Sequence, residues 1–101
     1  MPEVIYDPQK LGDGERYAAL YVGYGGMSRQ ILAEFDLDLT APATANDLAP
    51  RNLSGFELPA QEALTLARER AREASLRKIL VIDPLGLLSH ATINRYARRR
   101  P

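Results

Sequence analysis

The chain has 101 residues, the size of one domain, and its 13 basic and 13 acidic side chains give no net charge at pH 7. It has no cysteine and one histidine, which excludes disulfide frameworks, thiolate metal sites and a histidine metal cage within one chain. No apolar run approaches the roughly 20 residues that cross a membrane, and the first residues lack a secretory pattern. We therefore expect a cytoplasmic, bacterial-type protein with no membrane partner, metal or cofactor.

Charge is unevenly placed along the chain. Residues 1–50 carry a net charge of −5 and residues 51–101 carry +5. Halves of opposite sign either neutralise each other by packing or mark an interaction surface. We favour packing, because charge statistics speak to association and solubility rather than to fold.

Residues 16–39 predict a β-hairpin. Apolar and polar side chains alternate from Met27 to Leu39, which is typical of a half-buried strand. Gly25 and Gly26 fit a two-residue turn that pairs Leu20 with Ile31, since such turns require positive φ. A strand follows these glycines, whereas a phosphate-binding loop needs a helix N-terminus there, so the sequence disfavours phosphate binding.

The same register predicts a second sheet face that carries tyrosines. It places Tyr17 opposite Glu34 and Tyr21 opposite Gln30, on the face turned away from the core. Aromatic residues are enriched at interfaces, so this face predicts a homodimer or a contact with another protein, unless the 40–58 connection covers it. The candidate partner-binding residues are Tyr17, Tyr21, Gln30, Leu32 and Glu34.

Three carboxylates share the polar side of the second predicted strand. Glu34, Asp36 and Asp38 lie two residues apart, so neighbours are separated by about 6.5–7 Å along the strand. That spacing is too wide for one tight metal site unless a loop closes on it. We expect a solvated acidic face that discourages edge-to-edge pairing and that a basic partner could recognise.

A long connection, residues 40–58, leads into the main helix. The helix is predicted over Leu58–Lys78, because small apolar residues recur there at helical spacing. A stripe of alanines lets a helix approach a sheet closely. The outer face mixes arginine and glutamate, which is typical of a solvated surface.

The last third of the chain predicts a second hairpin. Ile79–Asp83 reads as a strand, and Asp83-Pro84-Leu85-Gly86 has the residues of a type I turn. A strand then starts at Leu87, or alternatively Ser89 caps a terminal helix; we favour the strand. The predicted fold is α+β, a single domain over residues 1–101 with an antiparallel sheet of about four strands, two hairpins and one main helix on one face.

The C-terminus holds the sharpest cluster of positive charge. Arginine with an interleaved tyrosine can contact phosphates and stack on a base, which predicts nucleic-acid binding as an alternative function. Against it, the whole domain is neutral, and residues 97–101 are also explained as a frayed basic tail. The residues of this alternative are Arg95, Tyr96, Arg98, Arg99 and Arg100.

No motif in the sequence predicts catalysis. His90 is the natural general base, but its neighbour Ser89 would face the other way on a strand. An enzyme would need an acid from a second subunit beside His90. We therefore predict a small non-enzymatic binding module that self-associates through the tyrosine face, with the nucleic-acid reading and an enzyme at a dimer interface as alternatives.

Overall fold

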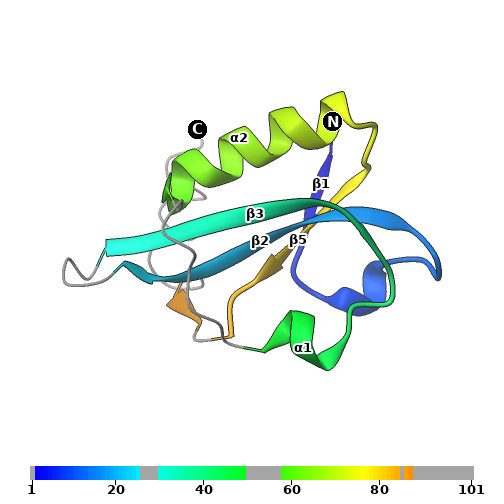
Figure 1. The fold of residues 1–101 in the computed structure, drawn as a ribbon, viewed down its shortest axis with the longest axis horizontal. Helices are drawn as coiled ribbons and strands as arrows, with labels where there is room; N and C mark the ends of the chain where they lie inside the picture. The colour runs from blue at the N-terminus through cyan, green and yellow to red at the C-terminus, as the bar shows by residue number, and fades with distance from the viewer. Residues whose placement is uncertain (1, 26–29, 50–57, 85, 88–101) are drawn as a thin grey trace, which may run out of the picture.

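The computed structural model describes residues 2–25, 30–49, 58–84 and 86–87, which form one sheet with a helix on one face (Figure 1). Five strands, one long helix and two short helices make up this part of the chain. They are β1 (Glu3–Ile5), η1 (Pro8–Lys10), β2 (Arg16–Gly25), β3 (Gln30–Thr40), α1 (Ala45–Leu48), β4 (Leu58–Pro59), α2 (Ala60–Glu73) and β5 (Lys78–Ile82).

The predicted α+β class with one main helix on the sheet is confirmed. The strand order is β1-β5-β2-β3-β4. β3 pairs antiparallel with β2 and β4, whereas β5 pairs parallel with both β1 and β2. The sheet thus has five strands rather than about four, and its pairing is mixed.

The predicted second hairpin is not among the described pairings. The turn itself forms, because the Gly86 N–H donates to the Asp83 carbonyl at 3.0 Å and the Leu87 N–H donates to Asp83 Oδ1 at 2.9 Å. β5, however, lies between two parallel neighbours, and Leu87 has helical rather than extended backbone. The expected strand after Leu87, the basic tail and His90 lie outside the described residues.

The first hairpin forms, with a register shifted by four residues from the prediction. Leu20 lies opposite Phe35 rather than Ile31, and Tyr21 lies opposite Glu34. The connection therefore holds residues 26–29 between the paired Gly25 and Gln30, not two glycines alone. Because four is an even number, the side chains from Ile31 to Asp36 still point to their predicted faces.

A β-bulge in β3 changes the face of its last residues. Ala19 lies opposite Asp36, but Tyr17 lies opposite Leu39, so β3 has one extra residue here. Asp38 takes the left-handed conformation, φ 66°, and its carboxylate pairs with Arg16 on β2. The extra residue turns Leu39 to the face opposite α2, although the alternation predicted it beside Phe35.

Helix α2 packs on the sheet through small residues, as predicted. Its buried positions are all alanine: Ala60, Ala63, Ala67 and Ala71. The helix ends at Glu73, five residues before the predicted end at Lys78. Ser75 there has φ 61°, its N–H donates to Arg72, and the Leu76 N–H donates to Ala71. These two bonds form a Schellman motif, and Leu76 is buried beside the helix.

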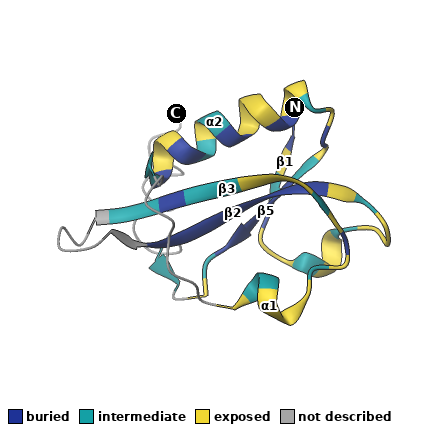
Figure 2. Cartoon of the chain, viewed as in Figure 1, coloured by how far each residue is buried: buried dark blue, intermediate teal, exposed yellow. Residues whose placement is uncertain are grey.

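β2 and β5 are buried along most of their described length (Figure 2), and apolar side chains pack on both faces of the sheet. On the α2 side, Leu20, Ile79 and Val81 pack against the helix alanines. On the other side, Tyr17 and Leu80 belong to a second cluster that η1 and the segment after β3 cover. β2 and β5 carry residues of both clusters, which makes them the centre of the molecule.

The segment between β1 and β2 is tied to the start of β5 by one ion pair. Lys78 Nζ donates to the Lys10 carbonyl at 2.6 Å and to Glu15 Oε1 at 3.2 Å. The same Glu15 oxygen accepts the Gly12 N–H at 2.7 Å. The Gly12 N–H and the Lys78 ammonium lower the pKa of Glu15 below its ordinary value, because both stabilise the carboxylate. This network fixes the loop that covers the tyrosine side of the sheet.

Candidate interaction surfaces

The tyrosine face is where the alternation placed it, but the chain itself covers it. Tyr17 and Tyr21 lie on the face opposite α2, with exposed fractions of 0% and 4%. Leu11, which directly follows η1, and Leu48 of α1 pack against the cluster that contains both tyrosines. The predicted partner-binding role of these two tyrosines therefore needs correction, since neither offers a surface in the described structure.

The 40–58 connection provides part of this cover. Thr44 begins α1 with a capping box, in which its hydroxyl accepts the Asp47 N–H at 3.1 Å and Asp47 Oδ2 accepts the Thr44 N–H at 2.8 Å. The short helix brings Leu48 onto the tyrosine side. The sequence analysis allowed a second copy, another protein or the 40–58 connection to cover the tyrosine face. The described part of the 40–58 connection does cover part of it.

The other three predicted partner-binding residues lie on β3. Gln30 pairs with Gly25 at the start of the strand. Leu32 is half-buried and lies between Gly23 and Pro59, and Glu34 is half-buried opposite Tyr21. Glu34 and Leu32 therefore form part of the body of the sheet.

The residues of the nucleic-acid alternative fall outside the described part of the chain. They are Arg95, Tyr96, Arg98, Arg99 and Arg100. The same holds for His90, on which the enzymatic alternative depends. Both alternatives stay predictions from the sequence.

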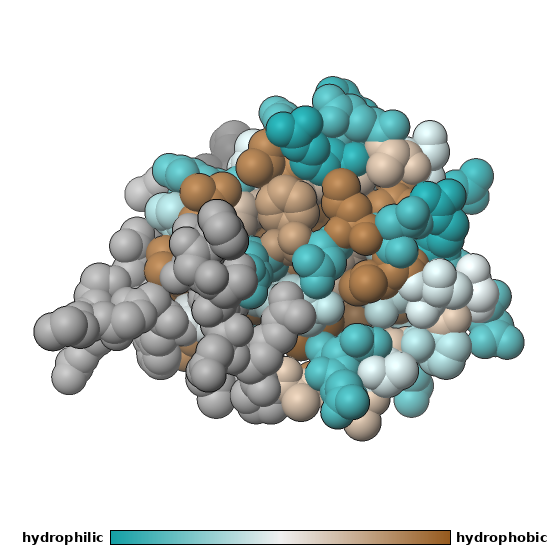
Figure 3. All heavy atoms as spheres, in the orientation of Figure 1, coloured by the Kyte–Doolittle hydropathy of each residue, from teal (hydrophilic) through white to brown (hydrophobic). Residues whose placement is uncertain are grey.

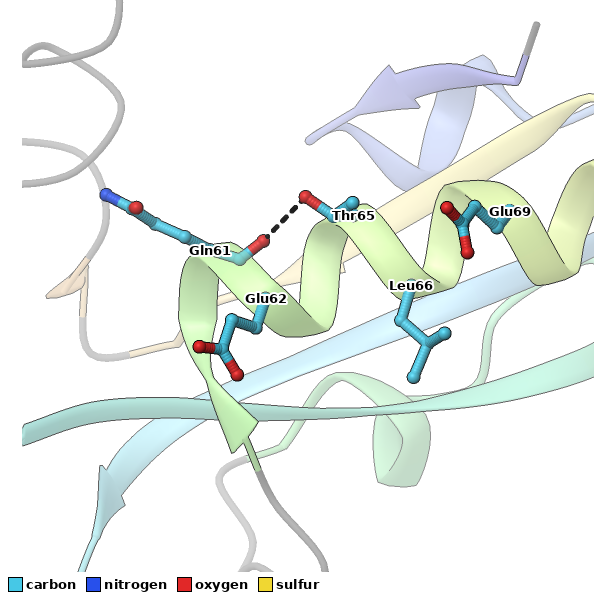
Figure 4. Close-up of a pocket in the computed structure, with 5 residues that line it drawn as sticks. All are labelled: Gln61, Glu62, Thr65, Leu66 and Glu69. Carbon is cyan, nitrogen blue, oxygen red and sulfur yellow. Dashed lines mark hydrogen bonds between the residues drawn. The ribbon is translucent and has the colours of Figure 1, made fainter.

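Apolar side chains reach the surface along the line where α2 crosses β3. On β3, Phe35 is half-buried and Leu37 is 36% exposed. On α2, Leu66 is half-buried and points from the helix toward β3 (Figure 4). A space-filling view shows brown and tan spheres gathered between the helix and the strand, among teal ones (Figure 3). We call this the α2–β3 surface.

A shallow hollow of about 310 Å³ adjoins this surface on α2. Its described walls all belong to the helix, and the Thr65 hydroxyl inside it donates to the Gln61 carbonyl at 3.1 Å (Figure 4). The lining residues are Gln61, Glu62, Thr65, Leu66 and Glu69. Walls from one helix make a groove between side chains rather than an enclosed ligand pocket.

The hollow is acidic on its polar side. Glu62 and Glu69 are both exposed, and no lysine or arginine stands among its described lining residues. Arg70, the next residue along, pairs with Glu73 at 3.3 Å. An apolar strip flanked by two carboxylates results.

Sequence reasoning treated this side of the helix as plain solvated surface. The missed signal is Leu66, a large apolar residue outside the alanine stripe on a side otherwise made of Glu62, Thr65 and Glu69. A role for Leu66 depends on the neighbouring strand, because α2 packs on β3, the strand that carries Phe35 and Leu37. Helical periodicity alone does not contain that information.

A second hollow, of about 290 Å³, lies on the opposite side of the sheet. Its walls come from the segment around η1 and from the residues between β3 and α1. Leu11, Ala41, Ala43 and Leu48 contribute apolar surface, and Asp13 adds a carboxylate. The four apolar residues are members of the cluster that buries Tyr17.

The hydroxyl of Tyr17 is the one described buried side-chain polar atom without a hydrogen-bond partner. Burial raises the pKa of Tyr17, and the nearby Asp47 carboxylate raises it further. An unsatisfied buried polar group costs about 1–3 kcal/mol of stability. The phenol is therefore neutral at physiological pH, and its hydrogen-bonding capacity is unused.

No protein-family model matches this chain, and no curated protein or solved structure matches it either. Within the described residues there is no group of three or more metal-ligating side chains and no helix long and apolar enough to cross a membrane. We therefore infer a function from the two hollows and the α2–β3 surface alone.

Proposed function

We propose that this protein is a small non-enzymatic binding module that holds a basic, partly apolar segment of another protein on its α2–β3 surface. The observation that carries the proposal is the partly exposed strip of Phe35, Leu37 and Leu66 beside the carboxylates of Glu62 and Glu69. Apolar side chains of the partner would cover the strip, and lysine or arginine would meet the two carboxylates.

A basic partner suits this surface better than a second copy of the chain. In a two-fold dimer the same patch meets itself. Glu62 and Glu69 would then approach their own copies, and like charges brought together at an interface are unfavourable. A segment that alternates basic and apolar residues avoids this repulsion and offers apolar contacts to the strip as well.

The test is a binding titration with a defined probe. A fluorescein-labelled peptide of seven residues that alternates lysine with leucine is titrated with the protein, and fluorescence anisotropy reports binding. We expect saturable binding that weakens as salt rises, because the surface charges are exposed. The same peptide with glutamate in place of lysine should not bind.

Variants locate the binding surface. Glu62→Gln and Glu69→Gln should each weaken binding about two- to fivefold, which is the range of an exposed charge pair. Leu66→Ser should weaken it further by removing apolar contact. The matched control is Glu3→Gln, which removes an exposed carboxylate on β1 at the far edge of the sheet and should leave binding unchanged.

Two results would overturn the proposal. Equal loss of binding in Glu3→Gln and Glu62→Gln would show only nonspecific attraction between the peptide and an acidic protein. A dimer by light scattering that Leu66→Ser dissociates, together with no peptide binding, would mean that the surface joins two copies of the chain.

A further inference from the structure

We propose that the second hollow, between η1 and α1, binds a small organic ammonium ion that carries an apolar chain. This site lies on the opposite face of the sheet from the α2–β3 surface and does not depend on the function proposed for that surface. Three observations carry it: the apolar wall, the unsatisfied hydroxyl behind the wall, and the sign of the nearby charges.

The wall is suited to a hydrocarbon chain. Leu11, Ala41, Ala43 and Leu48 line a space of about 290 Å³. This volume is near the lower end of the range for small-molecule sites, so the ligand is small. Apolar lining with few polar groups is the ordinary composition of such sites.

The hydroxyl of Tyr17 supplies a polar contact behind that wall. Tyr17 belongs to the same apolar cluster as the four residues that face the hollow, and its hydroxyl oxygen has no hydrogen-bond partner. Folded proteins rarely leave such an atom unsatisfied, so each case calls for an explanation. An ammonium N–H that reached past Leu48 would donate to this oxygen.

Movement of Leu48 requires little rearrangement. It is the last residue of α1, which has only four residues, none of them buried. Its N–H donates to the Thr44 carbonyl at 3.2 Å, a long bond for a helix. A ligand therefore gains access to Tyr17 by shifting one short helix, while the sheet stays in place.

The charges around the hollow select a cation. Asp13 belongs to its lining, and Asp47, next to Leu48, acts electrostatically on the Tyr17 hydroxyl. Lysine and arginine are absent from its described lining. Carboxylates beside an apolar space raise the local concentration of cations and repel anions.

A matched set of three ligands tests the proposal. Hexylammonium, 1-hexanol and hexanoate share one chain and differ in the charge of the head group. Each is titrated into isotope-labelled protein, and the NMR shifts of the backbone amides are followed. We expect saturable shifts at Leu11, Ala43 and Leu48 with hexylammonium. Hexanol should bind about fivefold more weakly, and hexanoate weaker still.

Two variants separate the charge from the hydroxyl. Asp13→Asn removes an exposed carboxylate and should bring hexylammonium affinity close to that of hexanol. Tyr17→Phe keeps the ring, and with it the fold, and should weaken hexylammonium binding while removing an unsatisfied atom. Glu69→Gln, on the far side of the molecule, is the control and should change nothing.

The proposal fails if the three ligands bind with equal affinity or if none gives saturable shifts at these amides. It also fails if Asp13→Asn and Glu69→Gln behave alike. Asp13 is exposed, so its replacement leaves the packing intact, and this comparison decides the matter even where Tyr17→Phe perturbs the fold.

Discussion

Glu15 shows how a single side chain can hold a covering loop in place. Its Oε1 atom accepts a backbone N–H from Gly12 and an ammonium N–H from Lys78, and Lys78 in turn reaches the Lys10 carbonyl. The ionised carboxylate strengthens both contacts to Oε1, and only in that form does Glu15 make an ion pair with Lys78. The loop that carries Leu11 over the tyrosine side therefore depends on the charge state of Glu15.

This dependence predicts a loss of stability in acid. The pKa of Glu15 in the folded chain lies below its ordinary value of 4.5, so the folded state favours the carboxylate. Its contribution is complete above that value and is lost as pH falls through the folded-state pKa. Urea unfolding at neutral pH and at about pH 3 should show a smaller acid-induced loss in Glu15→Gln than in the parent.

The control for this experiment is Glu62→Gln, which removes an exposed carboxylate on α2. It should leave the acid-induced loss as large as in the parent. If Glu15→Gln loses as much stability in acid as the parent does, the carboxylate does not act as the anchor of the loop.

For single residues, the sequence predicted the sheet face on which a side chain lies, but it did not predict whether that side chain is buried. Alternation placed Tyr17 and Tyr21 on the face opposite the helix, and this is confirmed. Their burial was not predictable, because it depends on Leu11 and Leu48, two leucines in segments without periodicity. The sequence pattern of an aromatic side chain on the second sheet face is the same whether a loop of the chain or a partner protein covers it.

At the scale of elements, the hairpin shows the difference between face and register. The period of two assigns side chains to faces whatever the loop length, provided the shift is even. The exact pairing depends on the turn, and the glycine pair suggested a turn two residues long where residues 26–29 form the connection. The sheet face of Leu39 was predicted wrongly for a related reason: the β-bulge at Asp38 does not alter the pattern of apolar and polar residues.

The end of α2 yields a prediction about stability. Ser75 occupies the left-handed position of the Schellman motif with φ 61°, where a side chain is strained and glycine is not. Ser75→Gly should raise the free energy of unfolding by about 0.5–1 kcal/mol. Chemical denaturation measures the change.

Ser75→Ala is the matched variant, because alanine keeps the Cβ atom that causes the strain. It should give no gain over the parent. A glycine variant no more stable than the alanine variant would show that the left-handed conformation costs nothing at this position.

At the scale of the whole molecule, stability should fall from the sheet centre toward α1. The backbone of β5 is paired on both sides over Ile79 and Leu80, and both residues are fully buried. Native-state hydrogen exchange should show these amides opening only with global unfolding. The amide of Leu48, in a four-residue helix with no buried residue, should exchange through a local opening of much lower free energy.

Equal protection of Leu48 and Leu80 would contradict this prediction. It would also show that α1 does not open separately from the sheet. The covered tyrosine side would then form one cooperative unit with the core.

The overall class could be predicted from the sequence, but the sheet order could not. One long helix and an alternating hairpin were enough for the α+β class. β1 has only three residues, Glu3–Ile5, too few for a period to appear. β5 looked like the first strand of a hairpin because a turn follows it. Its parallel pairing with β1 and β2 rests on contacts between residues some 60–75 positions apart.

The position of β5 matters for a chain that is made from its N-terminus. β5 lies inside the sheet, between β1 and β2, and it is the last described strand to be synthesised. Until Lys78–Ile82 has left the ribosome, β1 has no neighbour in the sheet, and the side of β2 that pairs with β5, from Ala18 to Tyr21, has no partner strand. Nascent chains that stop short of residue 82 would therefore expose a sheet edge of the kind that pairs with other chains.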